Sequence, residues 1–323
     1  SNWYVTFRQF AGEATTHGQI GSASSEDGVD WDSYTNLNYN GNPPWGGGGF
    51  GGTGVAQGRY PSALGTPEQP LSIWNEYTTG AGAAPYGGRP YYAYDEFGWG
   101  GGSFSYPSDI ELLYTLDYDL WVGSPSLSYN QDEDMWVVNV VYSDWTRENR
   151  WLYHSEAYAD GFVVFDGGGG ELIFDEDNDL VPGTADGSYN TSGYTSCSED
   201  GLCGCGIVGL FKGADPENLT GDAITEYHTG IFRLSDDHGA NWHGCENGGD
   251  VSTGCADDGL GYYFIPDSVF EEIVDTFDDN GSSPVEDPCD GTSYVLDDFW
   301  TGYELDFKVD SNGNPHYLLQ VYA

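Results

Sequence analysis

The chain has 323 residues and a formal net charge of −45, because 53 Asp and Glu are set against only eight Lys and Arg. It lacks the basic side chains that bind phosphates, it carries the wrong charge for an anionic membrane surface, and it has no apolar run of about 18 residues, so we expect no nucleic-acid binding and no membrane insertion. The high aromatic content and the 49 Gly favour strands that are joined by turns.

The first predicted strands are residues 3–10, where apolar and polar side chains alternate, and residues 19–24. The second strand leads into a turn in which Ser24, Glu26, Gly28 and Trp31 follow the spacing S-x-D-x-G-x-x-W, with Glu in the Asp position. A carboxylate in such a turn accepts N–H groups of its own loop, and the Gly takes a positive φ. We expect the Trp to pack back into the core.

A hairpin pattern then recurs along the chain. Each hairpin has an Asx- or Gly-containing turn and a second strand rich in aromatic or β-branched residues, as in residues 60–77, 124–142 and 303–322. Together with residues 206–212, the second strands begin near residues 3, 71, 136, 206 and 317, mostly about 65 to 70 residues apart, which indicates a degenerate repeat. The double-sized interval from 206 to 317 could hold one unit with an insertion or two units.

The turn motif returns after the predicted strand at residues 231–234, as Ser235, Asp237, Gly239 and Trp242. The two copies resemble the Asp box of sialidases and related β-propellers, and residues 58–78 and 308–322 resemble blades of bacterial secreted, cell-surface proteins. The resemblance implies an all-β chain, a β-propeller of five or six four-stranded blades with long Gly- and Asp-rich loops. We expect a single domain over residues 1–323, with the ring closed by N- and C-terminal strands in one blade.

One short helix is predicted at residues 267–278. Ser268 and Glu271 have capping-box spacing, and an apolar face follows them.

An acidic loop is the strongest metal candidate. Asp175, Asp177 and Asp179 alternate in a way that could direct three carboxylates at one Ca²⁺ ion, although the loop lacks the Gly and distal Glu of an EF-hand. The alternative is a solvated acidic loop. We expect no other cofactor, and we interpret His238 and His243 as turn residues rather than metal ligands.

The cysteine count is even, and all six lie after residue 196 in loop-like sequence (Cys197, Cys203, Cys205, Cys245, Cys255 and Cys289). This pattern favours three disulfides in an oxidising compartment, with Cys245–Cys255 paired on proximity, over a zinc site with unusual spacing. The chain is therefore expected to be secreted or on the cell surface. Three glycosylation sequons begin at Asn190, Asn218 and Asn280.

No catalytic residue is assigned from the sequence. Sialidase chemistry would need a cluster of arginines as well as paired carboxylates, and the chain holds only six arginines. We therefore expect a non-enzymatic extracellular protein with a structural or binding role, such as an adhesin or a filament subunit. A glycan is the candidate ligand. The alternative is a carbohydrate-active, sialidase-like hydrolase.

Two glycine-rich aromatic segments, residues 43–54 and 97–106, could drive self-association of such a charged chain. In the alternative interpretation, Trp45 and Trp99 fold back over their own blade ends.

Overall fold

The computed structural model describes residues 2–9, 18–35, 37–38, 58–78, 87–110, 120–144, 152–159, 161–165, 171–174, 193–210, 228–245, 262–278, 285–286, 289–294 and 300–322. Within these ranges the chain forms antiparallel sheets and one short helix. The strands of the first half are β1 (Trp3–Gln9), β2 (Gln19–Ser25), β3 (Asp32–Tyr34), β4 (Gly58–Gly65), β5 (Pro70–Thr78), β6 (Gly87–Tyr94), β7 (Ser108–Asp109), β8 (Leu120–Val122), β9 (Ser126–Asn130), β10 (Met135–Asp144) and β11 (Leu152–Ala159). The remaining elements are β12 (Val163–Phe165), β13 (Glu171–Phe174), β14 (Tyr194–Cys197), β15 (Cys203–Leu210), β16 (His228–Ser235), β17 (Tyr263–Phe264), α2 (Asp267–Asp278), β18 (Val285–Glu286), β19 (Ser293–Tyr294), β20 (Trp300–Val309) and β21 (Pro315–Tyr322).

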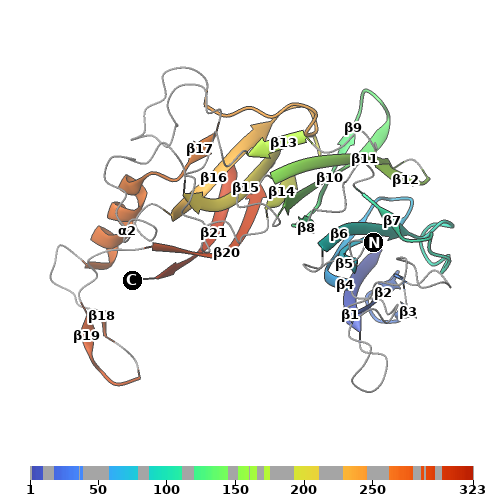
Figure 1. The fold of residues 1–323 in the computed structure, drawn as a ribbon, viewed down its shortest axis with the longest axis horizontal. Helices are drawn as coiled ribbons and strands as arrows, with labels where there is room; N and C mark the ends of the chain where they lie inside the picture. The colour runs from blue at the N-terminus through green and yellow to red at the C-terminus, as the bar shows by residue number, and fades with distance from the viewer. Residues whose placement is uncertain are drawn as a thin grey trace.

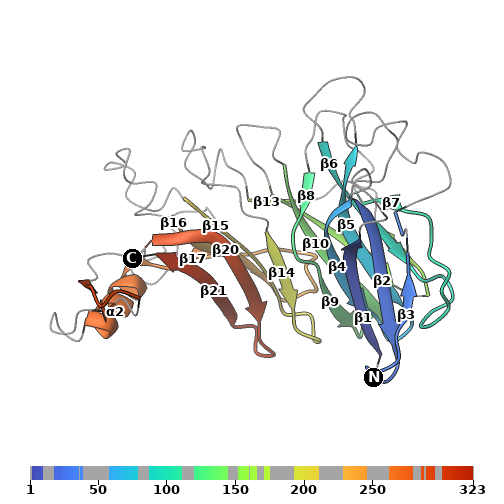
Figure 2. The same cartoon turned by 90° about the horizontal axis from the view of Figure 1, so that it is seen from below.

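The sheets follow one another in chain order. Among the described residues they are the three-stranded sheet β1–β3, the four-stranded sheets β4–β7 and β14–β17, the six-stranded sheet β8–β13, and the two-stranded sheets β18–β19 and β20–β21. Figure 1 shows them in a row that runs from β1–β3 to β20–β21, with α2 and β18–β19 beyond, and Figure 2 shows the same row from below. The predicted all-β fold with one short helix is confirmed, and five of these six described sheets, all except the β18–β19 hairpin, stand in the place of the five or six predicted blades.

Consecutive sheets pack face against face. A separate apolar cluster fills each interface, and each cluster draws on two neighbouring sheets. In β5, for example, Leu71 and Ile73 face β8–β13, whereas Trp74 faces the N-terminal sheet, because successive side chains of a strand point to opposite faces. This face-to-face succession is the packing of a propeller-like fold.

The predicted hairpins are confirmed by strand pairing. Strand β4 pairs with β5, β9 with β10, and β20 with β21, all antiparallel. In the interval 206–317, Val208 of β15 shares a core cluster with Phe307 of β20, so their two sheets are direct neighbours. Among the described residues, α2 and the β18–β19 hairpin lie between these strands in sequence, as in the alternative of one unit with an insertion.

Ring closure by terminal strands stays a prediction. Within the described residues β1 pairs with β2 and β20 pairs with β21, and both figures place the two terminal sheets at opposite ends of the row. Within the described residues, no helix is long and apolar enough to cross a membrane.

Candidate functional site

The first turn motif closes on residues one position later than predicted. The Ser25 hydroxyl donates to Asp27 Oδ1 (3.1 Å) and accepts the Gly28 N–H (2.8 Å), and Asp27 Oδ1 also accepts the N–H groups of Val29 and Asp30 (2.8 and 2.9 Å). Gly28 has φ of 77°, which places the reversal directly after Asp27. Ser25 and Asp27 therefore take the roles predicted for Ser24 and Glu26.

These hydrogen bonds fix the charge state of the turn. The N–H groups of Asp30 and Val29 hold the pKa of the Asp27 carboxyl below its ordinary value, because they favour the carboxylate. Asp27 is thus a permanently ionised structural acceptor above the acid range.

A pocket opens beside this turn. It has a volume of about 320 Å³, and its lining consists of four carboxylates, a tryptophan and small polar residues: Glu26, Asp27, Asp30 and Asp32, with Trp99, Gly100, Asn2, Ser24 and Ser25. Glu26, Asp30 and Asp32 are exposed, so three acidic residues that do not close the turn line the pocket.

Trp99 forms the aromatic wall of this pocket, and its position is fixed. Its indole Nε1 donates to the carbonyl of Thr66 (2.9 Å), and its ring meets Tyr4 edge-on at 6.1 Å between centroids. A Cβ added at Gly65 would lie 2.8 Å from the Trp99 ring, so the glycine permits the close approach. Trp99 therefore folds back over its own sheet end, as the alternative to self-association predicted, while Trp45 lies outside the described residues.

The loop that carries Trp99 is itself held by a buried carboxylate. Asp95, at the end of β6, accepts the N–H groups of Phe97 (3.1 Å) and Gly102 (2.6 Å). The pocket wall is thereby formed by local hydrogen bonding before any ligand arrives.

A buried polar contact anchors the N-terminal sheet next to β4–β7. Glu76 is fully buried, and its Oε2 accepts hydrogen bonds from Asn38 Nδ2 (2.9 Å) and Trp74 Nε1 (3.0 Å). Arg89 stands opposite Glu76 in the β5–β6 register and is also buried. These donors compensate for the burial of a carboxylate and set how the first sheet, with its turn, sits against the second.

The second turn motif has the predicted residues. The Ser235 hydroxyl donates to Asp237 Oδ1 (2.8 Å) and accepts the Gly239 N–H (2.9 Å), and Asn241 donates its backbone and side-chain N–H groups to Asp237 (2.9 and 2.6 Å). Burial raises the pKa of Asp237, but the hydrogen bonds from Asn241 and Ser235 outweigh it, so the pKa lies below its ordinary value. Trp242 is half-buried and packs against the core cluster, as expected for this motif.

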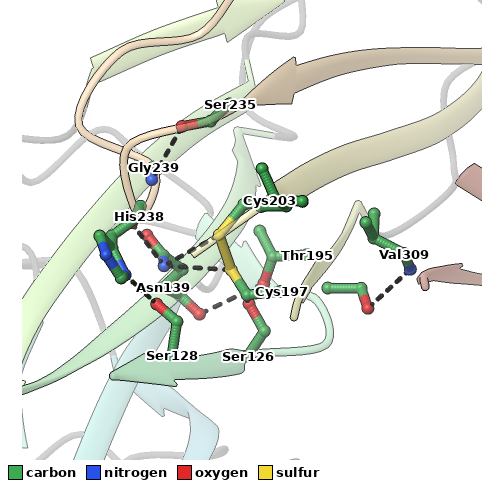
Figure 3. The surroundings of a disulfide bond; sticks show 12 residues. Ser126, Ser128, Asn139, Thr195, Cys197, Cys203, Ser235, His238, Gly239 and Val309 are labelled. Atoms are coloured by element: carbon green, nitrogen blue, oxygen red, sulfur yellow. Dashed lines mark hydrogen bonds between the residues drawn. A yellow bond between two sulfur atoms is a disulfide. The ribbon is translucent and has the colours of Figure 1, made fainter. Parts of the chain in front are cut away.

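Unlike the first, this second turn is tied to the neighbouring sheet, as Figure 3 shows. The buried Asn139 of β10 donates to the carbonyl of His238 (2.9 Å) and lies 3.4 Å from Cys197 Sγ, while His238 Nδ1 is 3.0 Å from Ser128 Oγ. His238 thus serves a turn, as predicted, and carries a positive φ of 63° there.

The cysteines only partly follow the prediction. Cys197 and Cys203 form a disulfide, and Cys245 is also disulfide-bonded, although its predicted partner Cys255 lies outside the described residues. The expected third bridge is wrong at Cys205, which is a buried free thiol in the core between sheets. Burial raises the pKa of this thiol well above its ordinary value, so it behaves as a small apolar side chain.

Other predicted sites remain predictions. Asp175, Asp177 and Asp179, and the sequons at Asn190, Asn218 and Asn280, lie outside the described residues. Within the part of the chain that the structure describes, no group of three or more His, Cys, Asp or Glu is arranged to hold a metal ion.

The acidic pocket was not predicted. Its carboxylates fall inside the first turn motif, which gave a signal, but Trp99 comes from a loop between β6 and β7 and reaches the turn only through packing.

Comparisons with known proteins give limited matches. No protein-family model matches the chain, and no curated protein matches it in sequence. Among solved structures, a GH32 β-fructofuranosidase of Bombyx mori, BmSUC1, matches with a TM-score of 0.34 and 10% identity, over 73% of this chain and 43% of that protein. A mutant of the same enzyme in complex with sucrose matches with a TM-score of 0.34 and 12% identity, over the same shares. This chain thus spans less than half the length of the proteins it matches.

These comparisons correct the main functional prediction. A non-enzymatic role as an adhesin or a filament subunit is not supported, since the two structures named above are glycoside hydrolases, the class of the alternative. Neither of these two structures is a sialidase.

Proposed function

We propose that the chain is a secreted hydrolase of neutral carbohydrate and that the pocket beside the first turn is its site. The observation that carries the proposal is a cavity of about 320 Å³ whose lining includes several exposed acidic residues and one fixed tryptophan. A pocket with an aromatic wall and a few convergent polar groups is a typical small-molecule site. The Cys197–Cys203 disulfide supports secretion.

The residues suit glycosidic hydrolysis by paired carboxyl groups. One carboxylic acid protonates the glycosidic oxygen as the bond to the anomeric carbon breaks, and a second carboxylate takes a proton from the water whose oxygen bonds to that carbon. Asp27 is occupied by the turn and its pKa is lowered, so it is unsuited to donate a proton. Glu26, Asp30 and Asp32 are left to supply the pair.

The charge of the site selects the substrate class. Among the described residues that line the pocket there is no Lys or Arg, and the chain carries a formal charge of −45. An anionic sugar such as sialic acid would be repelled rather than bound. Neutral sugars avoid this cost, can place C–H faces on Trp99 and can donate hydroxyl protons to the carboxylates.

The test is turnover of neutral oligosaccharides by the full chain and by Glu26→Gln, Asp30→Asn and Asp32→Asn. We expect kcat to fall about 100-fold or more in two of the three variants, since acid–base groups contribute about 10²–10⁴. Asp306→Asn is the matched control, because Asp306 is an exposed carboxylate on β20 and should leave turnover unchanged. Unchanged kcat in all three pocket variants would contradict the proposal.

A further inference from the structure

The outer face of the N-terminal sheet carries an exposed aromatic strip. Trp3, Val5 and Phe7 alternate along β1 and are 55%, 43% and 38% exposed, and Trp31, just after the turn, is 41% exposed. Successive side chains on one face of a strand are about 7 Å apart, so the strip on β1 is about 13 Å long. Contiguous exposed apolar surface of this kind usually marks an interaction site.

The aromatic rings of the strip pack on small residues of the paired strand β2. The residues opposite them on β2 are small, since Trp3 pairs with Ser25 and Phe7 pairs with Gly21. A Cβ at Gly21 would lie 2.7 Å from the Phe7 ring, and one at Gly28 would lie 3.4 Å from Trp3 Nε1. The rings therefore lie against backbone on one side and leave the other side to solvent, which fixes them without a ligand.

The strip leads to the pocket around the first turn. Trp31 Nε1 donates to the carbonyl of Gly28 (3.3 Å), the same glycine that Trp3 covers. Trp31 also lies between the pocket residues Asp30 and Asp32, and Asn2, which precedes Trp3, lines the pocket as well. The turn is thus bordered by the pocket on one side and by aromatic rings on the other.

The negative charge of the chain excludes several classes of ligand from this face. Carboxylates at the turn and the charge of −45 repel nucleic acids, anionic membranes and a second copy of the chain. The described outward residues of β20–β21, at the opposite end of the row, form a mainly polar face with Asp306, Lys308 and His316 beside the apolar Leu318, so this face is a poor match for the strip. A sugar ring has an apolar C–H face and hydroxyls at its edge, so it can stack on the rings and hydrogen-bond at the turn without adding charge.

We infer that the outer face of β1–β3, marked by Trp3, Phe7 and Trp31, binds a neutral polysaccharide chain and delivers it to the pocket. This inference deepens the proposed function and rests on it for the substrate class. The strip contributes to the affinity for polymers and takes no part in bond cleavage.

The test is electrophoresis of the full chain through gels that contain inulin, laminarin, dextran, xylan or hydroxyethylcellulose. The high negative charge drives migration, so binding to a neutral polymer is read directly as retardation. We expect at least one polymer to retard the wild type, with a Kd at least tenfold weaker in the double variant Trp3→Ala/Phe7→Ala. Trp3→Phe should restore most of the affinity lost in Trp3→Ala, and Leu318→Ala, at a more exposed apolar site on β21 (72%), should bind as wild type.

The outcomes separate the two proposals. Turnover of short oligosaccharides by Trp3→Ala/Phe7→Ala should fall far less than its affinity for the polymer, because Trp3 and Phe7 are not among the residues that line the pocket. Equal retardation of wild type and double variant, or no retardation by any polymer, overturns the proposed binding role of the strip, even if the pocket hydrolyses glycans. Retardation that depends on the strip, in a wild type that cleaves no glycan, supports the strip and refutes the hydrolase. A wild-type dimer in light scattering that the double variant abolishes would make a second copy the occupant and overturn the inference.

Discussion

The two turn motifs share their hydrogen bonding and differ in what surrounds them. In each, a serine hydroxyl donates to an aspartate two residues later, at 3.1 Å in the first turn and 2.8 Å in the second. The second turn is tied to the next sheet by Asn139 and Ser128, and its Trp242 packs on the core. The first faces a pocket, and its Trp31 is exposed. The local sequence thus determines the turn, and the neighbouring sheet determines whether it is structural or open to a ligand.

The largest expected difference between the turns is in their tryptophans. Trp242→Ala removes a ring that packs on the core and should lower the free energy of unfolding by about 3 kcal/mol, whereas Trp31→Ala should lower it by less than about 1 kcal/mol. Urea unfolding of both variants measures this. Similar losses in the two would break the distinction between a structural and an open turn.

A smaller loss of stability is expected when the hydrogen bond between the second turn and the neighbouring sheet is removed. Asn139→Ala leaves the partly buried carbonyl of His238 without its donor and should cost about 2 kcal/mol of stability. Asn2→Ala, at the rim of the open pocket, is the matched control and should cost less than about 0.5 kcal/mol. A thermal melting temperature for Asn139→Ala that equals the control would show that the second turn does not depend on its neighbour.

The smallest effect is expected from the aspartates of the turns, and it depends on pH. The folded-state pKa of Asp27 and of Asp237 is lowered from 3.8, so each carboxylate adds stability above that pH and loses it as the pH falls through the folded value. The melting temperatures of Asp27→Ala and Asp237→Ala should therefore lie below wild type at pH 7 and approach it in acid. If the difference in melting temperature between each variant and the wild type grew as the pH fell, the prediction would be wrong for both turns.

The sequence predicted the elements whose signals are local. Hairpins, the helix at residues 267–278 and both turn motifs follow from strand alternation, Asx and Gly turns and capping, and they appear near the expected positions. The first turn shifted by one residue: Ser24, Ser25, Glu26 and Asp27 offer two serine–carboxylate pairs, and Ser25 and Asp27 form the turn although the spacing of Gly28 matches the other pair.

Features that depend on packing between sheets could not be predicted from the sequence. Cys205 was expected in a disulfide because it lies near other cysteines in sequence, yet its strand position places it in the core between sheets. Trp99 lies about 70 residues from the first turn, and no local pattern shows that its indole binds Thr66 and forms the pocket wall.

The row of sheets has a consequence for how the protein loses structure. When each unit contacts only its neighbours, stability is close to a sum of nearest-neighbour terms, and unfolding starts at the ends, where a unit has one interface instead of two. Within the described residues, the sheet β1–β3 has its apolar interface with β4–β7, through Ile20, Leu37 and Trp74. The proposed site is shared across this interface, because Trp99 belongs to the β4–β7 sheet, so heat that separates these two sheets would abolish ligand binding while the central sheets are still folded.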